Sequence, residues 1–377
     1  MKKHFFFFLC FLLLTGCWDR RELNTLAVVQ AIGIDLTEEG QISLSTQILK
    51  PGEMKSGGEK SVWVTTSKGE TIFDAVRNAS LQADRRLFFS HNKVIIISEE
   101  VAKMGFIPLV DFLIRDAEAR GFAYVFVAQG KAIDILKGEH EQEANPGKAI
   151  ENLADISVLA SILPKRNLKD LFIVLSSKKT TSPILPGIKT EESDGKSQDM
   201  IVLGNTAVFK RDKLVGWFDR FESRGVLWVL NEVESGSIVV KSPLGNDKNV
   251  TLEILNTSTK LTPEITDNTL SITIKVQGEG NLVEQMSSGN LATPESFAEL
   301  EKRATDVIEE EIIAAVTKSQ KWGGDIFEFG EEFHRKYPQE WPELEEDWDE
   351  LFPKIEVKLE VSFQLIKAGL TSEPLNK

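Results

Sequence analysis

An unbroken run of ten apolar residues, Phe5 to Leu14, directly follows two lysines at the amino terminus. A permanent transmembrane helix needs about 20 such residues, so this run is too short to remain in a bilayer as a span. A positive end followed by a short apolar core is typical of an export signal. The sequence therefore predicts a signal peptide over residues 1–16. The remaining chain then has to fold after export.

Small residues stand immediately before Cys17, in the order Thr15-Gly16-Cys17, which is typical of a bacterial lipoprotein cleavage site. Cleavage is predicted between Gly16 and Cys17, with a diacylglyceryl group on the Cys17 thiol. Each buried methylene contributes about 0.8 kcal/mol, so two acyl chains make a stable anchor. The other cysteine, Cys10, would leave with the signal, so we expect no free thiol in the mature chain. Residues 17–25 are then a lipidated tether.

The overall composition is that of a chain that folds in water, with 41% apolar and 27% charged residues. The net charge of −14 disfavours nucleic acid as a partner, because a phosphate backbone is bound by cationic side chains. Neither a His-Glu-x-x-His nor a Gly-x-Ser-x-Gly motif is present. We therefore expect no metal and no cofactor beyond the lipid on Cys17.

Strand-like and helix-like patterns alternate through residues 26–190, as in an α/β domain. Residues 26–34 and 41–49 are expected to pair as strands across a short turn, and 94–97 has the composition of a buried strand. Between them, residues 72–83 repeat apolar positions at helical spacing. The polar stretch 176–198 contains two prolines and is the predicted domain boundary.

Residues 199–369 are predicted to form an α+β domain. A hairpin is expected at 201–217, strands at 238–241, 250–255 and 270–276, and a closing strand at 355–363. A long helix is expected over 294–318, because apolar residues recur there at helical spacing after a proline that suits a first helical turn. The fold class is thus mixed α/β and α+β, in several domains, with a long C-terminal helix.

Acidic and aromatic residues alternate through the segment from Asp325 to Phe352, which includes Trp341 and Trp348. Three interpretations remain open. The aromatic side chains enter the core while the acids face water, the segment is a partner-binding face, or paired carboxylates form a catalytic cleft of the kind that glycosidases use.

Several short motifs, in this order along the chain, resemble those of the Ger(x)C family of spore germination lipoproteins. They include the tether, the strand ending at Asp35, the Ser90-His91 block, Gly216-Trp217, and the block from Asp325 to Gly330. The family positions that match are Trp18, Asp19, Glu22, Leu23, Asn24, Gly33, Asp35, Ser90, His91, Arg115, Gly216, Trp217, Asp325 and Gly330.

The resemblance implies a non-enzymatic C subunit of a nutrient germinant receptor, lipid-anchored to the outer face of the spore inner membrane. It implies an A-type subunit and a permease-like B-type subunit as partners. It also implies three structural domains, with the first completed by a later segment. The matching positions carry no catalytic assignment in the family, so we interpret them as packing or assembly residues.

Two other functions are compatible with an anchored lipoprotein. The first is a solute-binding protein of an uptake transporter, although such proteins usually have two similar lobes and the halves here differ in pattern. The second is an anchored cell-wall hydrolase that would use the acidic aromatic segment. Both would remain attached through Cys17.

Overall fold

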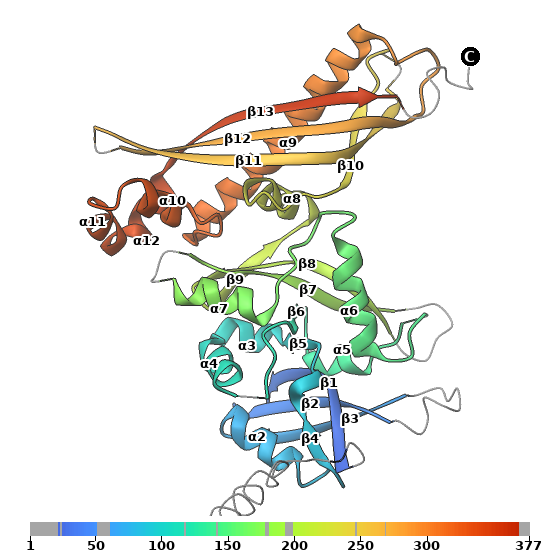
Figure 1. The fold of residues 1–377 in the computed structure, drawn as a ribbon, viewed down its shortest axis with the longest axis vertical. Helices are drawn as coiled ribbons and strands as arrows, with labels where there is room; N and C mark the ends of the chain where they lie inside the picture. Colours follow the sequence, from blue (N-terminus) through green and yellow to red (C-terminus); the bar gives the residue numbers. More distant parts are fainter. Residues whose placement is uncertain are drawn as a thin grey trace, which may run out of the picture.

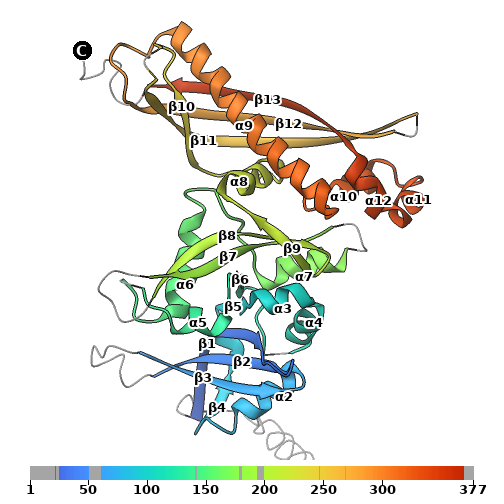
Figure 2. The ribbon, with the colours of Figure 1, turned by 180° about the vertical axis from the view of Figure 1, so that it is seen from behind.

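Two mixed β-sheets lie one above the other along the long axis of the molecule (Figures 1 and 2). The computed structural model describes residues 22, 25–50, 61–116, 118–140, 142–177, 181–192, 199–245, 247–267 and 269–368. Helix α8 lies between the two sheets in both views. The mixed α/β fold class and the long C-terminal helix that the sequence predicts are confirmed.

The first sheet has nine strands in the order β3-β2-β1-β5-β6-β7-β8-β9, with β4 paired to β1. Its strands are β1 (Leu26–Leu36), β2 (Ile42–Leu49), β3 (Val62–Gly69), β4 (Arg86–Phe88), β5 (Val94–Ile97), β6 (Tyr124–Ala128), β7 (Ile184–Glu191), β8 (Met200–Lys210) and β9 (Lys213–Phe218). Strands β1, β4, β5, β6 and β7 are joined in parallel, whereas β1–β2–β3 and β7–β8–β9 are antiparallel. The predicted pairing of residues 26–34 with 41–49 is confirmed.

Helices cover both faces of the first sheet. They are α2 (Ile72–Ala79), α3 (Glu99–Met104), α4 (Ile107–Arg115) and α7 (Leu168–Ser176) on one face, and α5 (Ala132–Lys137) and α6 (Pro146–Ser157) on the other. The 3₁₀ turn η3 (Phe89–His91) joins β4 to β5. Strand β5 is apolar throughout because Ile95 and Ile97 pack under one helical layer and Val94 and Ile96 under the other.

The predicted domain boundary at residues 176–198 lies inside the first sheet. Residues 184–191 of this stretch form strand β7, which pairs with β6 on one side and β8 on the other. A bulge after Pro186 accommodates the proline within the β7–β8 ladder. The sheet therefore continues across the predicted boundary, and residues 200–218, expected in the C-terminal domain, supply its last two strands.

The second sheet has the order β10-β11-β12-β13, and the long helix α9 (Pro294–Trp322) packs against it. Its strands are β10 (Gly236–Lys241), β11 (Asn249–Thr266), β12 (Thr269–Gln285) and β13 (Glu356–Lys367). Around this sheet lie α8 (Arg220–Val229), α10 (Phe329–Lys336), α11 (Trp341–Glu346), α12 (Trp348–Leu351) and the turn η4 (Phe352–Lys354).

Strands β11 and β12 are much longer than the sequence predicts. Gly278 and Gly280 interrupt the apolar alternation of β12, and glycine is normally unfavourable within a strand. Here the ring of Phe363 from β13 lies where their side chains would be, since an added Cβ would come within 2.7 Å and 2.5 Å of that ring. The two glycines thus make room for an aromatic side chain of the neighbouring strand.

The aromatic residues of the acidic segment are buried. The core beside the second sheet includes Phe327, Phe329, Phe333, Trp341 and Trp348. This confirms the first of the three interpretations as far as the aromatic side chains are concerned. The acidic side chains remain largely on the surface, except for Asp325, which is 3% exposed.

The carboxylate of Asp325 closes this segment into a compact turn. It accepts hydrogen bonds from the backbone N–H groups of Phe327 (3.2 Å), Phe329 (3.1 Å) and Gly330 (2.8 Å) and from the indole N–H of Trp348 (3.2 Å). Burial raises the pKa of Asp325 to about 7, although the four donors act in the opposite direction.

Helices α8 and α9 cross at very short range around Glu311. Its buried carboxylate accepts from the indole N–H of Trp228 (2.8 Å) and forms a two-pronged ion pair with Arg224. Gly225 permits the close approach, because a Cβ there would lie 2.0 Å from the backbone oxygen of Glu311. A buried carboxylate is tolerated here because it is fully paired.

We expect Gly225→Ala to destabilise the protein by about 1–3 kcal/mol, because the added methyl group forces α8 away from α9. Thermal unfolding of the purified protein measures this. Gly121→Ala is the matched control, since a Cβ there meets only ordinary contact at 3.4 Å. Equal melting temperatures for the two variants would contradict the close helix crossing.

The raised pKa of Asp325 makes stability depend on pH. The folded state holds this proton up to about pH 7, whereas the unfolded carboxyl loses it near 3.8. The stabilisation of the folded state by this bound proton is thus fully present at low pH and is lost as the pH rises through 7. The free energy of unfolding changes by at most about 1.4 kcal/mol per pH unit on this account.

We predict that Asp325→Asn lowers the free energy of unfolding by about 1–3 kcal/mol, because the amide places a donor opposite backbone donors. The difference from the natural protein should be larger at pH 5 than at pH 8 in urea titrations. Asp347→Asn, at an exposed carboxylate, is the control. A difference that is independent of pH would refute the raised pKa.

Candidate functional site

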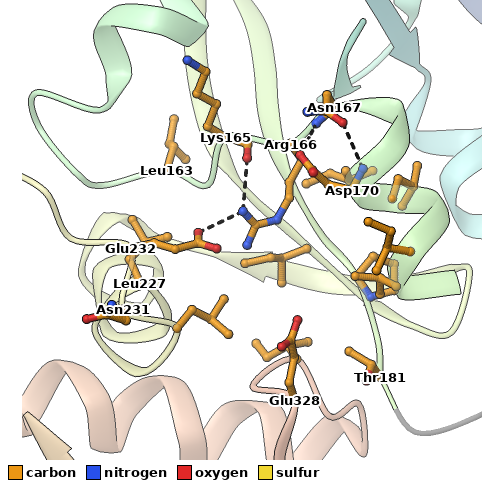
Figure 3. A pocket seen from close by; sticks show the side chains of 18 of the residues that line it. Leu163, Lys165, Arg166, Asn167, Asp170, Thr181, Leu227, Asn231, Glu232 and Glu328 are labelled. Carbon is orange, nitrogen blue, oxygen red and sulfur yellow. Dashed lines mark hydrogen bonds and ion pairs between the residues drawn. The ribbon is translucent and has the colours of Figure 1, made fainter. Parts of the chain in front are cut away.

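A cavity with a volume of about 550 Å³ lies at the junction of the two sheets (Figure 3). Its upper wall belongs to the first sheet and its helix α7, and its lower wall to the end of α8 and the loop before α10. The lining mixes charged, polar and apolar groups, and the labelled residues in Figure 3 are Leu163, Lys165, Arg166, Asn167, Asp170, Thr181, Leu227, Asn231, Glu232 and Glu328.

Arg166 provides the positive charge of the upper wall. The backbone oxygen of Arg166 accepts from the N–H of Val125 in β6 (3.0 Å), which fixes this residue to the first sheet. Its Nη1 donates to Glu232 (2.9 Å) and to the backbone oxygen of Lys165 (3.1 Å). The side chain is 15% exposed, so the charge is held largely away from bulk water.

Glu328 provides a negative charge on the opposite wall, and Figure 3 shows Arg166 and Glu328 pointing toward one another across the cavity. Burial raises the pKa of Glu328, whereas the charge of Arg166 lowers it and that of Glu232 raises it. In the described part of the chain, no hydrogen bond reaches the Glu328 carboxylate.

Three residues that line the cavity have left-handed backbone conformations, which side chains other than glycine rarely adopt. They are Ser161 (φ 44°), Asn231 (φ 59°) and Glu328 (φ 61°). Local bonds hold two of them in place. The Ser161 hydroxyl accepts from the N–H groups of Glu234 (3.1 Å) and Ser235 (3.2 Å), and the Asn231 side chain accepts from Thr259 (2.8 Å).

The tether residues Gly16, Cys17, Trp18, Asp19, Leu23 and Asn24 lie outside the described residues. Glu22 is exposed, and its backbone oxygen accepts from the N–H (3.0 Å) and hydroxyl (2.7 Å) of Thr25. Lipidation of Cys17 therefore stays a prediction from the sequence.

Gly33 and Asp35 both contact the start of α5. An added Cβ on Gly33 would lie 3.1 Å from Ala132, and the Asp35 carboxylate accepts from the N–H groups of Ala132 (2.8 Å) and Ile133 (3.0 Å). Burial raises the pKa of Asp35, and these two bonds lower it. In the structure, both residues seat a helix on strand β1.

The other family positions are spread over the molecule. Ser90 and His91 lie in η3, and the His91 ring packs 5.7 Å from that of Phe88. Arg115 forms an exposed ion pair with Asp111 (2.9 Å). Gly216 leaves room for Trp322, because a Cβ would lie 2.5 Å from its ring, and the backbone oxygen of the neighbouring Trp217 accepts from Lys318 (3.1 Å).

Asp325 and Gly330 are brought together in the buried turn, and no family position among the residues that the structure describes lines the cavity. No sequence motif singles out Arg166, Asn231 or Glu232, and Glu328 belongs to the acidic aromatic segment without being distinguished within it. Their positions in the sequence are too far apart for any local motif to link them.

The ranges that the structure describes contain neither a cluster of metal ligands nor a helix suited to span a membrane. Within them, no three His, Cys, Asp or Glu side chains gather as a metal site would require. The helices in these same ranges include none with both the length and the apolar character needed to cross a membrane.

Both halves of the chain match families of known proteins. Residues 19–190 match the family described as spore germination protein N-terminal domain, and residues 204–369 match the one described as spore germination B3/GerAC like, C-terminal. Spore germination protein KC of Bacillus subtilis (strain 168) is 30% identical over 388 residues, which cover 97% of this chain and 95% of that protein.

Two further relatives extend this likeness. Spore germination protein B3 of Bacillus subtilis (strain 168) is 25% identical over 374 residues, covering 96% of each chain. The crystal structure of the GerBC protein shares the fold, with a TM-score of 0.61 at 21% identity, over 89% of this chain and 96% of that one. Since a relative at 30% identity spans nearly the entire chain, the chain belongs to the spore germination protein family, the Ger(x)C family that its motifs resemble.

Proposed function

We propose that this protein is the lipid-anchored C subunit of a spore nutrient germinant receptor, needed for receptor assembly or signalling. The observation that carries the proposal is the match to spore germination proteins along both halves of the chain. The Thr15-Gly16-Cys17 motif supports cleavage after Gly16 and diacylglyceryl modification of Cys17. The anchor would place the protein on the outer face of the spore inner membrane.

The proposed work of this subunit is binding rather than catalysis. Its family positions hold helices and turns in place, as Asp35 does for α5 and Asp325 for the turn before α10. We propose that it acts without a metal or another cofactor, beside an A-type subunit and a permease-like B-type subunit.

Cys17→Ala should release the protein from the membrane or stop its maturation, because the acyl chains supply the anchoring free energy. Fractionation of spore membranes followed by immunoblotting measures this, together with nutrient-triggered germination. Cys10→Ala is the matched control, because the proposal places Cys10 in the part that is removed. A Cys17→Ala protein that stays in the membrane fraction and supports normal germination would refute the anchor.

The partner proposal is tested by a tagged pull-down from detergent-solubilised spore inner membranes, with mass spectrometry of the bound proteins. We expect a permease-like subunit and an A-type subunit to copurify. An unrelated lipoprotein with the same tag controls for capture through the lipid alone. Recovery of an ATP-driven transporter instead would favour a solute-binding protein, and recovery of neither would remove the support for a receptor subunit.

A further inference from the structure

The cavity at the junction of the sheets contains two opposite charges that do not neutralise each other directly. The Nη1 atom of Arg166 donates hydrogen bonds to Glu232 and to the backbone oxygen of Lys165. Its Nε and Nη2 donate to no group among the residues that the structure describes. The described ranges also contain no ion pair between Arg166 and Glu328, although each charge acts on the other. Arg166 therefore keeps two donors available beside its ion pair with Glu232, and the exposed Glu328 carboxylate, on the opposite wall, can accept a donor from a ligand.

The rest of the cavity wall combines apolar residues with further polar and charged ones. Leu163, Leu171 and Ile184 line the side of the first sheet, and Leu227 and Ile326 line the opposite side. A volume of about 550 Å³ is within the range of small-molecule sites, which combine apolar walls with a few polar groups that orient the ligand. The wall thus offers an apolar surface beside two charges of opposite sign.

Residues with unusual backbone conformations are concentrated around the same cavity. The described residues include six non-glycine residues with left-handed backbone conformations, and three of them, Ser161, Asn231 and Glu328, line this cavity. Such conformations are unfavourable and persist where the surrounding structure fixes them, often at binding sites. At Glu328 the conformation aims the carboxylate into the cavity (Figure 3).

We propose that this cavity binds a small zwitterion with an apolar substituent, an α-amino acid in chemical class. Its carboxylate would accept from the free guanidinium donors of Arg166, and its ammonium would donate to Glu328. The apolar substituent would lie against Leu227 and Ile326. A ligand of this class would engage the free donors of Arg166 and the carboxylate of Glu328 at once, whereas a simple anion or cation would engage one of them.

The test uses L-leucine as the probe, titrated by calorimetry against the purified protein in detergent. N-acetyl-L-leucine lacks the ammonium and L-leucinamide lacks the carboxylate, so each should bind about tenfold to a hundredfold more weakly than L-leucine. No membrane or partner subunit is needed. The result therefore stands apart from the test of the receptor proposal.

Variants assign each charge to its partner. Glu328→Gln should bind L-leucine at least about tenfold more weakly, yet bind N-acetyl-L-leucine as the natural protein does, because that analogue does not use Glu328. Arg166→Gln should give the converse pattern with L-leucinamide. Glu343→Gln, at an exposed acid outside the cavity, is the charge-matched control and should leave all three affinities unchanged.

Two results would overturn the proposal. The first is the absence of saturable L-leucine binding by the natural protein at millimolar concentrations. The second is binding that distinguishes leucine from its analogues equally well in Glu328→Gln and in the natural protein. If Arg166→Gln fails to fold because its ion pair with Glu232 is lost, the Glu328→Gln comparison alone decides the matter.

Discussion

The buried carboxylate of Glu311 is the contact on which the arrangement of the two sheets depends. It anchors Arg224 and Trp228 of α8 to α9, and Gly225 lets the two helices meet backbone to backbone. Helix α8 follows directly from the last strand of the first sheet, where the Ser223 hydroxyl donates to Thr206 of β8 (2.8 Å). One helix is thereby tied to both sheets. Removing one member of such a pair leaves an uncompensated buried charge, which costs more than the pair contributes.

A second buried carboxylate fixes the other wall of the junction. The Asp325 side chain organises the turn that begins α10, while its backbone oxygen accepts from the N–H of Ser182 (2.7 Å) beside strand β7. Ile326 and Glu328, which face the cavity, lie within this turn. The left-handed backbone of Glu328 is therefore maintained by the hydrogen bonds of Asp325 on either side of it. Asp325 and Gly330 of the family block thus support the cavity wall, while Ile326 and Glu328 of the same block line it.

The sequence predicts those elements whose cause is local. The apolar run of β5 and the spacing of α9 give correct strands and helices, because burial on two faces or one stripe leaves a clear pattern. The sequence predicts poorly those elements whose structure depends on contacts with residues far away in the chain. Strand β12 continues through Gly278 because Phe363, far along the chain, fills the space above it. Residues 184–191 are part of the stretch that the sequence predicts as a domain boundary, but in the structure β6 and β8 pair with them.

The cavity could not be predicted from the sequence, for the same physical reason. Arg166 and Glu328 face one another only because α8 and α9 hold the sheets at a fixed separation. A zwitterion bound between them would contact both units, so its binding free energy would depend on how the units are placed. A ligand can shift an equilibrium between two arrangements only by its difference in affinity for them. Charges on opposite walls provide that difference, since the gap between Arg166 and Glu328 changes with any rotation about α8.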